Sequence, residues 1–171
     1  MATKTVGRKQ AGKKSPQKAK RPAPAARKSV AARSKPAAPK AVAPVRQRID
    51  PGWVWDDSLP LAQAQQQGNV IYVSGQVAYN SDGQLVGEGD IKAQTRQVFQ
   101  NIKEVLESAG ATMQDIIKIN TYITDQSKFM DMLEVRKEIF GDNPPASTAV
   151  VVAGLAFPGL LIEVEAIAMK A

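Results

Sequence analysis

The stretch that decides the fold is Pro144–Ala171, which reads PPASTAVVVAGLAFPGLLIEVEAIAMKA. Two apolar segments, residues 147–153 and 160–169, predict two strands joined by a short connection. The second segment carries Glu163 and Glu165, which point to the same face because side chains alternate along a strand. The same face also carries three apolar side chains, Leu161, Ile167 and Met169. Either this face is solvated or the carboxylates have a function, because an ionised group on an apolar face is otherwise costly.

The chain before this stretch predicts an alternation of strands and helices. The predicted elements are strands at 70–77, 85–86 and 116–123, and helices between Asp90 and Gly110 and over residues 129–140. Their order, β-β(-β)-α-β-α-β-β, predicts an α+β fold in which one mixed sheet carries two helices on a single face. Because the other face has no helix to cover its apolar side chains, it predicts an oligomer interface.

Residues 1–49 differ in composition from the rest of the chain. They hold 15 of the 23 Lys and Arg residues and none of the 16 Asp and Glu residues, with prolines that would interrupt any helix. We therefore expect a disordered basic tail at 1–49 and a folded domain at 50–171. Such a tail suits nonspecific contact with nucleic acid or another polyanion, an organelle transit peptide, or a solubilising extension. A cytoplasmic location is expected, with organelle targeting or nucleoid association through the tail as the alternatives.

The chain contains neither cysteine nor histidine. Their absence excludes Cys-His and Ser-His nucleophile pairs, thiolate metal sites and imidazole ligands. Acid–base chemistry must then come from Asp, Glu, Lys, Tyr or bound water. No cofactor and no metal site are expected, and no apolar run is long enough to predict a transmembrane segment.

Several motifs, in the same order along the chain, resemble the Rid family (reactive intermediate deaminases, also called YjgF-like proteins). The C-terminal motifs are Pro-Ala-Ser-Thr at 145–148, Leu-Ala-x-Pro at 155–158 and Leu-Ile-Glu-Val-Glu-Ala-Ile-Ala at 161–168. Earlier ones are VIYVSGQV at 70–77, Ala93-Gln94-Thr95, Asn101-Ile102 and Ala109-Gly110-Ala111. The resemblance runs from about Pro60 to Met169. It implies the chorismate-mutase-like Rid fold and a homotrimer with sites in the clefts between subunits.

The resemblance also implies which residues form the site. Glu163 stands where the family's deaminases place the glutamate that activates water. Ser147 replaces the arginine that grips the substrate carboxylate, and Leu61 replaces a tyrosine that precedes the first strand. The other residues that the resemblance places near the substrate are Ser74, Gly75, Thr148 and Ala149.

The resemblance thus implies hydrolytic deamination of a reactive enamine or imine to a carbonyl compound and ammonia, with Glu163 activating water. Without an arginine at position 147, a substrate carboxylate loses hydrogen bonds worth about 1.5–3 kcal/mol each. A substrate that lacks a carboxylate, or carries it at a distance, fits better. Two alternatives remain: a trimer that binds a small metabolite without turnover, and an interaction module that contacts a polyanion through residues 1–49.

Overall fold

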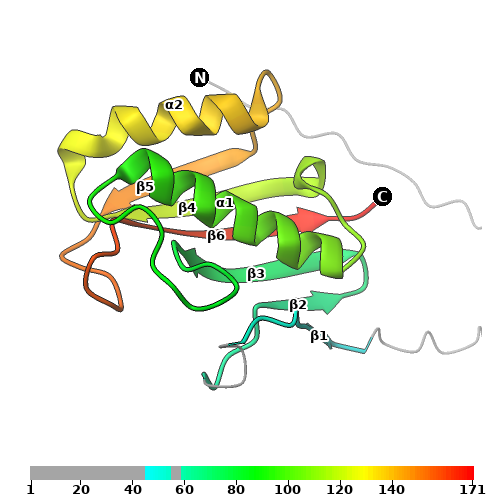
Figure 1. The fold of residues 1–171 in the computed structure, drawn as a ribbon. Coiled ribbons are helices and arrows are strands. Elements are labelled where there is room, and N and C mark those ends of the chain that lie inside the picture. The colour runs from blue at the N-terminus through cyan, green and yellow to red at the C-terminus, as the bar shows by residue number, and fades with distance from the viewer. Residues whose placement is uncertain (1–44, 55–58) are drawn as a thin grey trace, which may run out of the picture. The chain divides into compact units, whose positions relative to one another are not determined.

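The structure is a computed structural model that describes residues 45–54 and 59–171. Within these residues, six strands form one sheet in the order β1-β2-β3-β6-β4-β5 (Figure 1). The strands are β1 Gln47–Ile49, β2 Ala64–Gln67, β3 Val70–Val77, β4 Ile116–Ile123, β5 Ala146–Val151 and β6 Ile162–Met169. Neighbouring strands are antiparallel, except that β4 and β5 are parallel.

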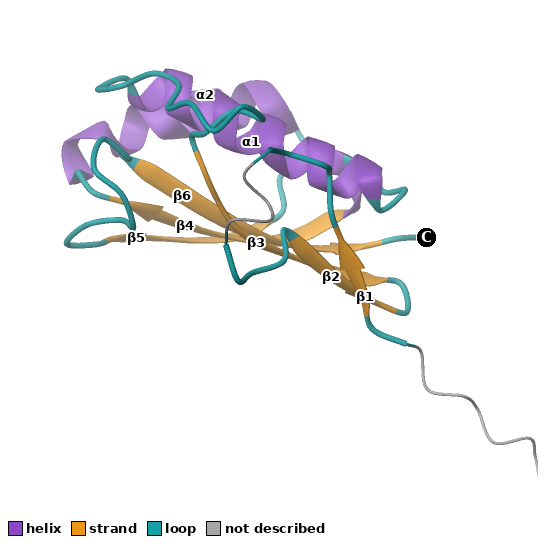
Figure 2. Cartoon of the chain, turned by 60° about the horizontal axis from the view of Figure 1, so that its bottom comes forward, coloured by secondary structure: helices purple, strands orange, loops and turns teal. Residues whose placement is uncertain are grey.

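Both α-helices, α1 Ile91–Ser108 and α2 Phe129–Phe140, cover the same face of the sheet (Figure 2). Two short 3-10 helices, Met113–Asp115 and Gln126–Lys128, precede β4 and α2. The predicted α+β fold, with one mixed sheet and two helices on a single face, is confirmed. None of the described helices is long and apolar enough to cross a membrane.

Helix α1 begins and ends at the residues that the sequence indicates. The Asp90 side chain caps its first turn by accepting hydrogen bonds from the backbone N–H groups of Lys92 and Ala93, at 2.9 and 3.1 Å. Gly110, with a φ of 67°, follows the helix in the left-handed conformation that glycine tolerates best. The predicted limits of this helix are therefore confirmed.

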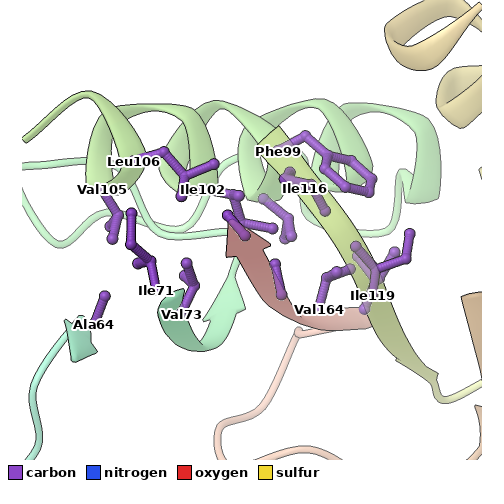
Figure 3. Close-up of a cluster of buried hydrophobic side chains, with 14 of the residues drawn as sticks. Ala64, Ile71, Val73, Phe99, Ile102, Val105, Leu106, Ile116, Ile119 and Val164 are labelled. Atoms are coloured by element: carbon purple, nitrogen blue, oxygen red, sulfur yellow. The ribbon is translucent and has the colours of Figure 1, made fainter. Parts of the chain in front are cut away.

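The hydrophobic core lies between α1 and the central strands (Figure 3). Ile102 and Leu106 of α1 are fully buried, as are Ile71 of β3 and Val164 of β6. The two helices meet through Phe99 and Phe140, whose rings are arranged edge to face with centroids 5.3 Å apart. Since β6 buries every second side chain against the helices, Glu163 and Glu165 must lie on the opposite, open face of the sheet.

Two strands at the β3 side of the sheet are not predicted by the sequence pattern. β2 consists of Ala64 and three glutamines, and β1 lies inside the segment assigned to the basic tail. Ile49 is nevertheless buried, at 4% exposure. The sheet begins at Gln47, before the expected domain boundary at Asp50, and the predictions for residues 1–44 lie outside the described residues.

The predicted strand at residues 85–86 is wrong. Leu85 makes only an isolated bridge with Tyr79. The turn before it is held by Asn80, whose side-chain oxygen accepts hydrogen bonds from the backbone of Asp82 and Gln84. Such side-chain bonds to the backbone favour a turn over an extended ladder.

Candidate functional site

Glu163 lies in the middle of the sheet. Its strand, β6, runs between β3 and β4, and Glu163 pairs with Val77 on one side and Tyr122 on the other. Its side chain is half-buried on the open face of the sheet. The central position fixes the backbone of Glu163 through hydrogen-bonded neighbours on both sides, which gives its carboxylate a defined place.

Gly75 leaves the space that the Glu163 carboxylate occupies. The register between β3 and β6 shifts between Val73 and Gln76, so Gly75 sits in a bulge. A Cβ atom built on Gly75 would overlap Glu163 Oε1 and lie 2.8 Å from Glu163 Cδ. Only glycine at this position therefore permits the observed carboxylate position.

Glu163 opens into a cavity of about 350 Å³. The described residues that line it are Leu59, Leu61, Gln63, Gly75, Val77, Tyr79, Gly83, Ala156, Phe157 and Glu163. Most of these side chains are apolar, and Glu163 is the one charged side chain among them. A small, mostly apolar cavity with one charged group is typical of small-molecule sites.

The environment of Glu163 favours the protonated form of its carboxyl group. Burial, and to a lesser extent the charge of Glu165, raise the pKa of Glu163 above its usual value. Glu165 is half-buried on the same face and accepts a hydrogen bond from Asn120 Nδ2 at 2.6 Å. Glu165 thus bonds to an amide on the open face, for which the sequence had left a solvated surface as one alternative.

Tyr122 adds a neutral hydroxyl beside the two carboxylates. The charge of Glu165, more than that of Glu163, raises the pKa of Tyr122. Tyr122, Glu163 and Glu165 line a second hollow of about 320 Å³ on the open face. Glu163 therefore borders both hollows.

The structure brings only some of the predicted site residues together. Leu61 and Gly75 line the cavity with Glu163, whereas Ser74 lines a neighbouring hollow with Glu165. The Ser74 hydroxyl donates a hydrogen bond to the carbonyl of Ala62 at 2.6 Å, which joins β3 to the segment before β2.

The Ser-Thr-Ala sequence of β5 is split between the two faces of the sheet. Ser147 and Ala149 pair with the buried Ile119 and Thr121, and therefore take the helix side of the sheet. Thr148 takes the open side, where its hydroxyl accepts a hydrogen bond from Lys118 Nζ at 2.7 Å. Within this chain, none of the three lines the Glu163 cavity.

Two aromatic residues of the cavity, Tyr79 and Phe157, were not singled out by the sequence. Their rings are arranged edge to face, with centroids 6.0 Å apart. Phe157 lies in the connection between β5 and β6, and no periodicity in such a loop indicates a site. Over residues 45–54 and 59–171, no cluster of acidic side chains is suited to hold a metal ion.

Comparisons with known proteins agree on one family. The family model described as Endoribonuclease L-PSP matches residues 57–170. A RutC family protein of Pyrococcus horikoshii is 44% identical over 111 residues, which are 65% of this chain and 87% of that protein. A 2-iminobutanoate/2-iminopropanoate deaminase of Dermatophagoides farinae is 37% identical over 108 residues, which are 63% of this chain and 84% of that protein. Among solved structures, RidA from an Antarctic Psychrobacter is 36% identical with a TM-score of 0.65, covering 72% of this chain and 99% of its own.

Proposed function

This chain belongs to the Endoribonuclease L-PSP family, also called YjgF/Rid, and we propose that it hydrolyses a reactive imine or enamine to a carbonyl compound and ammonia. Glu163 is the general base in this proposal. The observation that carries it is the half-buried Glu163 carboxylate, held against Gly75 at the wall of a mostly apolar cavity. Burial raises the pKa of Glu163 toward the range in which a carboxylate exchanges protons efficiently.

The reaction needs one water molecule and no redox partner. Water attacks the carbon of the C=N bond while Glu163 accepts one of the water's protons, which gives a carbinolamine. Glu163 then returns that proton to the nitrogen, the C–N bond breaks, and the hydroxyl group passes its remaining proton to the departing ammonia as the C=O bond forms. Imine and water thus give carbonyl compound and ammonia, and Glu163 returns to its ionised form. An enamine enters the same route after it tautomerises to the imine.

The cavity favours a substrate without a carboxylate near the reacting carbon. Ser147 carries no charge, and among the described lining residues of the cavity there is no lysine or arginine. A carboxylate placed there would face the Glu163 carboxylate without a compensating cation. Specificity for 2-imino acids, which the name of the Dermatophagoides relative states for that protein, is therefore not part of the proposal for this chain.

The proposal includes a homotrimer with the site at a cleft between subunits. The open face of the sheet exposes large apolar side chains, namely Tyr72 at 55%, Ile117 at 47% and Met169 at 45%. Exposed apolar patches of this kind support an interface between copies of the chain. Sedimentation or light-scattering mass at micromolar concentration tests this part, with three copies expected. A stable monomer would contradict it.

Ammonia release tests the catalytic part. Imines with and without a carboxylate are generated enzymatically, and the rate above the spontaneous hydrolysis is measured with the full chain. Glu163→Gln is expected to abolish the acceleration while the fold and assembly remain. Glu138→Gln serves as the control, because this exposed carboxylate pairs with Arg96 outside the cavity. No acceleration on any imine by the well-folded protein would refute the proposal.

Contact with a polyanion is a second candidate function, favoured by the charge of the N-terminal segment. Residues 1–49 contain 15 basic and no acidic residues, while the remainder carries eight basic and 16 acidic residues. We expect binding to nucleic acid that weakens steeply with salt. Deletion of residues 1–44, which spares the β1 strand at Gln47–Ile49, should remove this binding. Unchanged binding after the deletion would exclude the tail as its cause.

A further inference from the structure

The inference that follows rests on the proposed function and concerns the substrate that the Glu163 cavity selects. The cavity has two chemically different parts. One part presents the Glu163 carboxylate beside Gly75. The other is formed by Leu61, Val77, Tyr79 and Phe157, which are apolar or aromatic. A ligand that fills the cavity must therefore satisfy a negative charge at one end and an apolar surface at the other.

The aromatic part of the cavity is held from both sides. Asn101 of α1 donates hydrogen bonds from Nδ2 to the carbonyls of Val77 and Tyr79, at 2.9 and 2.8 Å. Gln94 of the same helix bonds to the backbone of the two residues that flank Leu160, at the end of the loop that carries Phe157. Its Nε2 donates to Gly159 O and its Oε1 accepts from Leu161 N, both at 2.8 Å. Helix α1 thus holds the backbone at Tyr79 and the backbone just after Phe157, which favours a cavity wall that is formed before a ligand binds.

The partial exposure of Phe157 gives the aromatic part its capacity for a ligand. Phe157 is 47% exposed although it contacts Tyr79, so a large part of its ring remains open for contact. Aromatic pairs contribute about 0.5–1.5 kcal/mol beyond the area that they bury. The volume of about 350 Å³ is sufficient for a ring-sized substituent beside a small polar head.

The charge at the other end selects the head group. No cation is among the described residues that line the Glu163 cavity. A half-buried carboxylate in such surroundings stabilises a positively charged ligand and repels a negative one. A protonated imine carries its positive charge on nitrogen, directly beside the carbon that water attacks. The carboxylate that would bind this cation is also the proposed base for the attacking water.

We propose that the substrates are protonated imines of the form R–CH=NH₂⁺, in which R is an aromatic or branched apolar group and no carboxylate is present. The reaction is R–CH=NH₂⁺ + H₂O → R–CHO + NH₄⁺. Such imines are the products of the two-electron oxidation of primary amines, so an enzyme of the amine-oxidising class must supply them. This reaction class differs from the eliminations and amino-acid oxidations that yield carboxylated imines.

Stable ligands test the selectivity without any turnover. Benzylamine has the ring and the charge of such a substrate but no C=N bond, methylamine has the charge alone, and benzoate has the ring with the opposite charge. Calorimetric titration of the full chain at neutral pH is expected to give benzylamine an affinity at least about tenfold above those of methylamine and benzoate. Benzoate binding as tightly as benzylamine, or no benzylamine binding at all, would overturn the proposal.

Three variants locate the binding site. Phe157→Ala should weaken benzylamine about fivefold, and Glu163→Gln should weaken it about tenfold. Met130→Ala removes an exposed apolar side chain from α2, outside the cavity, and should leave the affinity unchanged. Unchanged benzylamine affinity in both cavity variants would also overturn the proposal.

The two proposals fail in different ways. If ammonia release shows turnover of carboxylated imines only, the imine-hydrolase function stands and the proposed selectivity is wrong. If benzylamine binds as described but no imine is hydrolysed faster than in buffer, the selectivity of the cavity stands and the catalytic role of Glu163 is wrong.

Discussion

Replacement of Gln94 by leucine tests how the fold supports the cavity. Gln94 is fully buried on α1, and its amide bonds to three backbone groups from two loops. Its Nε2 donates to Gly87 O at 3.1 Å and to Gly159 O at 2.8 Å, and its Oε1 accepts from Leu161 N at 2.8 Å. Leucine has a similar size and keeps the helix intact, so the substitution removes these three bonds and little else.

The three lost hydrogen bonds set the expected cost. A buried hydrogen bond contributes about 1 kcal/mol net, and more when its partner is left unsatisfied. Gly87, Gly159 and Leu161 are not fully buried, so water can replace part of the bonding. We therefore expect the free energy of unfolding to fall by about 3 kcal/mol, which is roughly a hundredfold in the unfolding equilibrium constant.

Equilibrium unfolding in urea, followed by tryptophan fluorescence, measures this cost. Protein concentration must be the same for all variants, because dissociation of an oligomer shifts apparent stability. The matched control is Gln100→Leu, the same substitution at an exposed position of the same helix, where Gln100 Nε2 donates a hydrogen bond to the side chain of Glu104 at 3.0 Å. The control should change stability by less than about 0.5 kcal/mol. Equal effects of the two substitutions would refute the role assigned to Gln94.

Four further outcomes are expected. Gly75→Ala should lower the rate of imine hydrolysis at least about tenfold while the protein stays folded, because the new Cβ displaces the Glu163 carboxylate. Gly154→Ala is the control for the rate assay, because a Cβ at that position meets no atom within 4 Å. The rate of imine hydrolysis should fall on the acid side of the pH–rate profile with a midpoint above the ordinary glutamate pKa, since only ionised Glu163 accepts a proton. Glu165→Gln should move this midpoint to lower pH, because it removes a repelling charge. Because the pKa of Glu163 is raised in the folded state, ionisation of this group lowers the stability of the protein. Glu163→Gln should therefore unfold at a higher urea concentration than wild type at pH 7, and this advantage should vanish as the pH falls below the ordinary glutamate pKa. A constant difference between the two proteins at all pH values would contradict this reasoning. Ile102→Ala, at a fully buried position, should cost about 2–5 kcal/mol in the same unfolding assay.

The elements that the sequence predicts well are those whose signal is local. Helix α1 carries its own N-cap at Asp90, its own apolar stripe and its own terminal Gly110, so its limits follow from one stretch of chain. β1 and β2 have no such local signal, because the three glutamines of β2 and the short, mostly polar segment of β1 show no alternation of apolar and polar side chains. β2 forms a strand because β3 offers it an edge with unsatisfied backbone groups, and β1 pairs in turn with the free edge of β2; neither partner is visible in the residues of these strands.

The candidate site likewise combines features that a local sequence pattern predicts with features that it does not. The shared face of Glu163 and Glu165 follows from strand periodicity alone, and the burial pattern of β6 confirms it. The contact between Glu163 and Gly75 depends on how β3 and β6 align around a bulge, which no local pattern indicates. The resemblance grouped Ser147 and Thr148 as neighbours in one site, but consecutive strand residues face opposite sides, and the two are therefore separated by the sheet.

The two carboxylates of β6 show why position on a face does not by itself define a catalytic base. Glu163 and Glu165 share a strand, a face and partial burial, yet their neighbours differ. The Nδ2 group of Asn120 donates a hydrogen bond to Glu165 Oε1 at 2.6 Å. Glu163 instead lies against Gly75 at an apolar cavity wall, where burial and the charge of Glu165 raise its pKa. Because Glu163 combines burial at the cavity wall with a raised pKa, it is the carboxyl group suited to exchange a proton with a bound ligand, whereas the Asn120 amide holds the Glu165 side chain in place beside it.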